Sequence, residues 1–186
     1  MNARSYLEAF YNIMNSLVIT DLSAQAIDYD DAVNAVITMI RGQDAQGKKI
    51  IIIGNGGSAS IASHAAIDFL NNGGIRALTF NDASILTCLS NDYGYPQVFA
   101  KPLSCFTDEG DILVAISSSG KSENILNAVK VARDLKAQII TLSGFAPANP
   151  LRVLGEYNFY VDSSCYGYVE VAHQLILHTI ADLMMA

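Results

Sequence analysis

Two short segments rich in glycine and serine show the clearest chemical pattern in the sequence. They read 54-GNGGS-58 and 117-SSSGKS-122, and each directly follows an apolar run that predicts a buried strand. Unpaired backbone amides at the start of a helix, together with serine hydroxyl groups, form a binding site for an anion. The second segment has more serines than helix capping requires, since one N-cap side chain suffices. The two segments therefore predict a site for a single phosphate group.

Both segments also match parts of nucleotide-binding motifs. The first, read as 54-GNGGSA-59, fits the G-x-G-x-x-A pattern of dinucleotide-binding folds, which requires an acidic residue about 20 residues further on. Asp82 follows the next predicted strand but lies beyond that spacing, which weakens this alternative. The second segment ends in GKS as a P-loop does, but Ala115 stands where the first glycine of a P-loop is required. The P-loop interpretation therefore fails.

A second set of polar side chains lies on two predicted helices. His64 and Asp68 are four residues apart and share one helical face, and Glu170, Gln174 and His178 form a stripe in steps of four. A single histidine in an apolar helix is usually a structural residue with satisfied hydrogen bonds. If these two faces meet, His64, Asp68, Glu170 and His178 form a nitrogen and oxygen cluster suited to zinc or another divalent ion. The same cluster could transfer protons without a metal.

Strands alternating with helices must position these groups. Near-continuous apolar runs predict strands at Ile50–Ile53, Ile75–Phe80, Ile112–Ile116 and Gln138–Leu142, with a weaker one at Tyr157–Val161. The helices between them are expected at Ser58–Leu70, at Ser84–Cys88 continuing through Tyr95–Phe106, at Ser122–Leu135 and at about Tyr168–Met185. This alternation predicts an α/β fold, a three-layer α-β-α sandwich with a parallel sheet. Ligands bind at the carboxyl ends of such strands, where we expect both segments and 90-SNDYG-94.

The amino-terminal region differs from the rest. Apolar residues recur at helical spacing from Ser5 to Val18 and from Ala24 to Ile40, with Thr20–Asp21 as a break. This predicts an antiparallel helical pair, an extension of residues 1–43 used in oligomerisation, within a single domain of residues 1–186.

The amino-acid composition restricts the kinds of partner that the protein is expected to bind. The net charge of -7 argues against a nucleic-acid surface, and the apolar runs are far shorter than the roughly 20 residues that span a bilayer. No secretion signal is visible, and Cys88, Cys105 and Cys165 lack any CxxC spacing, so we expect free thiols in a reducing cytoplasm. With 51% hydrophobic and 16% charged residues, surplus apolar surface is expected between subunits.

Taken together, the motifs resemble a known family. In order they are 54-GNGGS-58, His64, 90-SNDYG-94, 116-ISSSGKS-122, 141-TLSG-144 and a closing helix with His173 and His178. Across nearly the whole chain this set resembles the sugar isomerase (SIS) domain family, and within it the phosphoheptose isomerases. The resemblance implies a flavodoxin-like five-stranded parallel sheet and a homotetramer with active sites between subunits. It also implies bound zinc and conversion of sedoheptulose 7-phosphate to D-glycero-D-manno-heptose 7-phosphate for nucleotide-heptose and lipopolysaccharide or related glycan synthesis.

The resemblance also assigns roles to residues. The substrate-binding set that it implies is Asn55, Gly56, Gly57, Ser58, Asp92, Ser117, Ser118, Ser119, Ser122 and Glu170, with the serines on the phosphate and Asp92 on sugar hydroxyls. The metal ligands that it implies are His64, Asp68, Glu170 and His178, of which Asp68 and His178 are also catalytic.

Two positions depart from the family pattern. Asp68 replaces a family glutamate and is one methylene shorter, and displacing a catalytic group by about 1 Å can cost roughly a hundredfold in rate. Glu170 replaces a family glutamine. The two changes either compensate for each other or indicate a different ketose phosphate. A non-catalytic SIS protein that associates with the bacterial replication initiator is the rival class, and the presence of His178 favours an enzyme, which would act through an enediolate.

Overall fold

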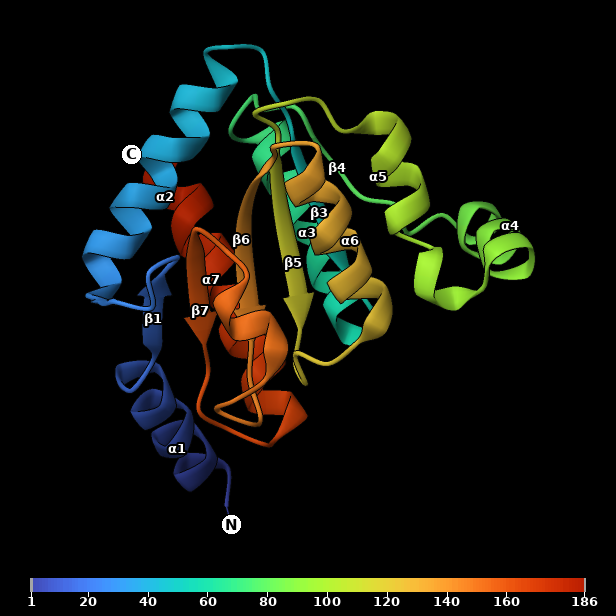
Figure 1. Ribbon diagram of the computed structural model, residues 1–186. Coiled ribbons are helices and arrows are strands. Elements are labelled where there is room, and N and C mark those ends of the chain that lie inside the picture. The colour runs from blue at the N-terminus through green and yellow to red at the C-terminus, as the bar shows by residue number, and fades with distance from the viewer. Residues whose placement is uncertain (1, 186) are drawn as a thin grey trace.

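A seven-stranded sheet runs through the centre of the protein, and the computed structural model describes residues 2–185 (Figure 1). The strands are β1 Val18–Asp21, β2 Ala26–Ile27, β3 Ile50–Gly54, β4 Ala77–Leu78, β5 Ile112–Ser117, β6 Gln138–Ser143 and β7 Tyr157–Tyr160. Their order in the sheet is β2-β1-β7-β6-β5-β3-β4. The five strands from β7 to β4 are mutually parallel, which confirms the predicted fold class.

Helices cover both faces of this sheet. They are α1 Ala3–Asn15, α2 Tyr29–Asp44, α3 Gly57–Asn71, α4 Ala83–Tyr93, α5 Ala100–Phe106, α6 Glu123–Asp134 and α7 Tyr166–Met185, with short 3-10 turns at Tyr95–Gln97 and Pro150–Val153. Side chains of β3 alternate between the two faces: Ile50 and Ile52 pack with α2, α3 and α7, whereas Ile51 and Ile53 pack with α5 and α6. The apolar runs of the sequence are therefore strands buried on both faces.

The sheet has two strands more than the predicted five, and both come from the amino-terminal region. α1 and α2 exist, but between them β1 and β2 form an antiparallel hairpin whose first strand pairs with β7. Val18, Ile19 and Thr20 are β-branched and favour a strand, and the Asp21 carboxylate accepts two backbone N–H bonds that close the turn. Figure 1 shows α1 and α2 at different ends of β1, so the predicted antiparallel helical pair is wrong.

The region between β4 and β5 also differs from expectation. The predicted strand Ile75–Phe80 contracts to the two-residue β4, and the chain then forms α4, a 3-10 turn and α5. The segment 90-SNDYG-94 is the end of α4, and Gly94, with φ +80°, terminates that helix. α4 lies beyond α5, away from the sheet (Figure 1), so this segment is not a loop at the sheet edge as predicted. None of the helices in residues 2–185 has the length and apolar character needed to span a bilayer.

Candidate active site

A pocket of about 250 Å³ lies where the neighbouring strands β3 and β5 end. Its lining residues are Asn55, Gly56, Gly57, Ser58, Ile116, Ser117, Ser118, Ser119, Ser122, Tyr166 and Glu170. Both glycine- and serine-rich segments therefore line one pocket at the carboxyl ends of the strands, where ligands bind in parallel α/β folds.

The first segment depends on two glycines. A Cβ at Gly54 would lie 2.5 Å from the Ser58 carbonyl oxygen, so only glycine permits the tight turn from β3 into α3. Gly56, with φ +54°, stands at the N-cap of α3 and provides no side-chain cap. The amides of Ser58 and Ala59 donate to the carbonyl oxygens of Asn55 and Gly56, so an anionic ligand would bind the preceding amides, those of Gly56 and Gly57.

A buried asparagine that the sequence did not single out packs against the second segment at Gly120. Asn149 is 2% exposed, and its amide donates to the Ser143 hydroxyl and to the carbonyl oxygens of Gly144 and Ala146. A Cβ at Gly120 would overlap the Asn149 side chain, and Gly120 has φ +62°. Ser122 begins α6 but makes no capping bond with its side chain, so its hydroxyl group is not needed for capping.

Side-chain amides join the two segments. Asn55 and Asn124 exchange reciprocal hydrogen bonds of 2.9 and 2.8 Å, and the Tyr95 hydroxyl donates to the Asn55 side-chain oxygen at 2.9 Å. Asn124 is 3% exposed. Sequence patterns did not identify Tyr95, Asn124 or the pocket residue Tyr166, because each takes its role from a contact with a distant part of the chain.

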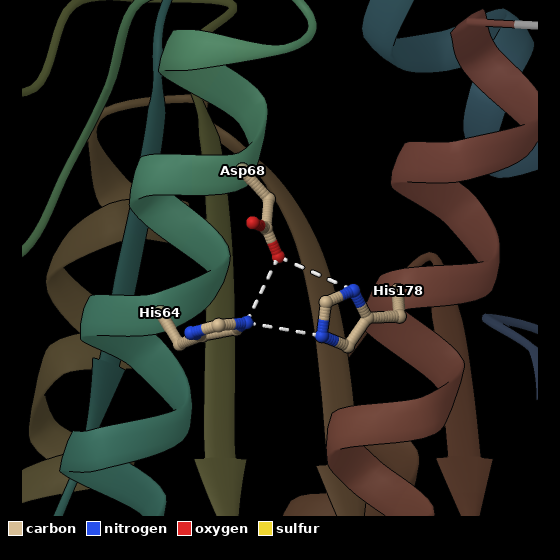
Figure 2. Close-up of side chains that lie close together, drawn as sticks. All are labelled: His64, Asp68 and His178. Carbon is tan, nitrogen blue, oxygen red and sulfur yellow. Dashed lines mark hydrogen bonds and ion pairs between the residues drawn. The ribbon is translucent and has the colours of Figure 1, made fainter.

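A separate cluster lies further along α3, where it faces α7 (Figure 2). Nε2 of His64 lies 3.0 Å from Nε2 of His178, and one Asp68 carboxylate oxygen lies 3.4 Å from His64 Nε2 and 3.3 Å from His178 Nδ1. The His64 side chain is 56% exposed, that of His178 36% and that of Asp68 16%. The cluster is therefore open to a ligand from solvent.

The chemistry of these donor groups suits a zinc ion. His178 can offer only one of its two ring nitrogens to a metal ion. One possible ligand atom from each of His64, Asp68 and His178 lies within 4.8 Å of the other two, and two histidines with one carboxylate form a common catalytic donor set for zinc. The residues present thus fit the metal.

Two predicted site residues lie apart from this cluster. Glu170 lies two turns before His178 on α7, about 12 Å along the helix axis, and its carboxylate lies against Gly57 in the pocket. Asp92 lies at the end of α4, where its carboxylate accepts from the Asn91 amide at 2.8 Å and lies 3.6 Å from Cys88 Sγ. Asp92 does not line the pocket of its own chain.

His173, on the same helix as His178, has a different environment. It is fully buried, and its Nε2 lies 3.2 Å from the Ser143 carbonyl oxygen, to which it donates. Burial lowers the pKa of His173 to about 4, so the ring is neutral near pH 7. Its environment is that of a structural histidine that supports the end of β6.

The fold and pocket define a class of protein that comparison with known families identifies. A family model described as "SIS domain" matches residues 10–144, so this chain contains an SIS domain. Phosphoheptose isomerase of Aliarcobacter butzleri is 38% identical over 146 residues, which cover 74% of this chain and 76% of that protein. Phosphoheptose isomerase of Helicobacter pylori is 36% identical over 154 residues, covering 80% and 79%. The chain belongs to the phosphoheptose isomerase family, as the motifs predicted.

Solved structures agree with this assignment. A phosphoheptose isomerase from Francisella tularensis superposes with a TM-score of 0.83 at 28% identity, covering 99% of this chain and 98% of that one. The phosphoheptose isomerase structure from Neisseria gonorrhoeae gives a TM-score of 0.74 at 29% identity, covering 82% and 84%.

Proposed function

We propose that this chain is an aldose–ketose isomerase that converts sedoheptulose 7-phosphate into D-glycero-D-manno-heptose 7-phosphate. The observation that supports this most is that α3 and α7 contribute to both the pocket and the cluster. The pocket includes the head of α3 and the start of α7, whereas His64, Asp68 and His178 lie further along the same two helices. The names of the relatives favour the same reaction.

The distance between the pocket and the His64–Asp68–His178 cluster suits a seven-carbon substrate. Ser58 and His64 are about 9 Å apart along the axis of α3. An extended seven-carbon phosphate spans about 10 Å from the phosphorus to the reacting carbons, given bonds of about 1.5 Å at tetrahedral angles. A phosphate held in the pocket would therefore bring the first two carbons of the sugar to Asp68 and His178.

Each part of the site then has a role. Ser58, Ser117, Ser118, Ser119 and Ser122, with the amides of Gly56 and Gly57, hold the phosphate, and this remote binding energy positions the reacting carbons. Either the Asp68 carboxylate or the His178 imidazole takes the proton from C1 of the ketose and returns it to C2, while a proton passes from the C1 hydroxyl to the C2 oxygen. The intermediate is an enediolate, and the product carries its carbonyl group at C1.

Zinc is the proposed cofactor, with His64, Asp68 and His178 as its ligands. When bound there, the ion would polarise the carbonyl group and stabilise the negative charge of the enediolate oxygen. Glu170 stays a predicted fourth ligand, although its carboxylate lies in the phosphate pocket.

We also propose that the protein is a homotetramer in the cytoplasm and that its active sites lie between subunits. Its product would then be used in lipopolysaccharide synthesis. Large apolar side chains are exposed on α1, α3 and α7, among them Leu7, Tyr11, Ile67, Leu70 and Val171, and subunit contacts would bury them. Asp92, at the end of the outlying α4, would then reach sugar hydroxyls in a neighbouring subunit.

The deciding experiment is the conversion of sedoheptulose 7-phosphate by the purified protein, followed by ¹³C NMR with and without a chelator. We expect an aldose resonance to appear at a rate that falls after chelation and returns with added zinc. No conversion, together with binding to a replication initiator, would instead identify a non-catalytic SIS protein.

A further inference from the structure

Glu170 places a negative charge in a pocket that otherwise suits an anion. Its carboxylate lies against Gly57, the first residue of α3, so closely that a Cβ at Gly57 would overlap the carboxyl group. Gly56 provides no side-chain cap for α3. A carboxylate at this end of a helix interacts favourably with the helix dipole.

No positive charge offsets this carboxylate among the pocket-lining residues that the structure describes. They comprise backbone amides, serine hydroxyls, an asparagine, a tyrosine and an isoleucine, together with Glu170 itself. An incoming phosphate would therefore rely on amides and hydroxyl groups, and it would approach a carboxylate in the same pocket of about 250 Å³. Like charges this close repel each other strongly at the effective dielectric constant of a protein surface.

We propose that Glu170 is an internal competitor for the phosphate group: its carboxylate takes the place of the phosphate at the head of α3 in the free protein. This inference rests on the proposed function, because it assumes that the pocket receives a phosphate. Substrate binding then displaces the carboxylate from its position beside Gly57. The consequence is a weaker affinity for every phosphorylated ligand, which favours release of the phosphorylated product.

The test is calorimetric titration of inorganic phosphate and of sedoheptulose 7-phosphate into the full chain and its Glu170→Gln variant. Glutamine keeps the size of the side chain and removes its charge. We expect the variant to bind inorganic phosphate about tenfold more tightly, and the gain to shrink as salt is raised, since mobile ions screen the repulsion. Glu123→Gln is the matched control, because Glu123 is an exposed acid in the first turn of α6 and does not line the pocket.

The outcomes separate this inference from the proposed function. Equal or weaker phosphate binding by Glu170→Gln, with measurable binding by the unaltered protein, would overturn the inference and leave the isomerase proposal intact. An equal gain in the Glu123→Gln variant would also overturn it, because the effect would then reflect net charge alone. If Ser119→Ala leaves phosphate binding unchanged both in the unaltered protein and in the Glu170→Gln variant, the pocket is not the phosphate site. The isomerase proposal and the inference about Glu170 then both fail.

Discussion

The proposed phosphate pocket and the His64–Asp68–His178 cluster share two helices but are built in opposite ways. The pocket is made from backbone turns that particular glycines permit, with small hydroxyl side chains around them. The cluster is made from long side chains on two facing helices and depends on how α3 packs against α7. The comparison indicates that the proposed binding pocket is specified locally in the sequence, whereas the geometry of the proposed catalytic cluster depends on tertiary packing.

The largest expected effect comes from changing the cluster while leaving the pocket intact. Asp68→Asn and His178→Gln should each lower kcat by about a thousandfold or more, since each removes a group that transfers a proton or binds the metal. The dissociation constant for inorganic phosphate should change by less than about twofold. Steady-state kinetics and phosphate titration measure the two quantities.

Asp134→Asn is the control for these variants, because Asp134 is exposed at the end of α6 on the other face of the sheet. Its kcat should equal that of the unaltered protein. Near-normal turnover in both cluster variants would refute the assignment of the cluster as the catalytic site.

The second effect is the dependence of folding stability on pH through His173 of α7. Burial lowers the pKa of His173 from its ordinary value of 6.5 to about 4 in the folded protein, so the unfolded chain takes up the proton first as the pH falls. The stability that neutral His173 provides is full above pH 6.5 and is lost progressively down to about pH 4, a loss of about 3 kcal/mol.

Urea unfolding at pH 7 and pH 4.5 checks this for the unaltered protein and for His173→Gln, which keeps a side-chain N–H donor. We expect the variant to lose less stability on acidification, by about 2 kcal/mol. Parallel losses in the two proteins would show that His173 is not the titrating group.

The pocket should respond more mildly than the cluster. Ser119→Ala and Ser122→Ala should each raise KM about tenfold with a smaller change in kcat, because each removes one hydrogen bond to a charged phosphate. A fall in kcat with KM unchanged would contradict the division between binding pocket and catalytic cluster.

The difference between local patterns and tertiary packing also explains which features could be predicted from the sequence alone. The runs Ile50–Ile53 and Ile112–Ile116 predicted central strands because both of their faces are apolar, and the glycine–serine segments predicted an anion site because their pattern is local. The hairpin of β1 and β2 was missed because Val18 continues the helical spacing of the preceding residues, and only its pairing with β7 makes the segment a strand.

The remaining differences between the predicted and observed site arise from contacts between residues far apart in the sequence. The face shared by His64 and Asp68 was predictable from helical periodicity, and so was the stripe that contains His178. Periodicity alone cannot say which turn of α7 lies opposite which turn of α3, so it could not reveal that the Glu170 carboxylate lies beside Gly57 in the pocket. Asn149 and Tyr95 were missed for the same reason, since each acts across a loop contact.

The most direct test of the central claim is the dependence of turnover on the length of the substrate. If a phosphate in the pocket brings the reacting carbons to the cluster, then kcat/KM should be highest for sedoheptulose 7-phosphate. It should fall by at least about tenfold for six-carbon ketose phosphates and further for five-carbon ones, because a displacement of about 1 Å already costs roughly a hundredfold. Equal or faster turnover of a five-carbon ketose phosphate would contradict the account.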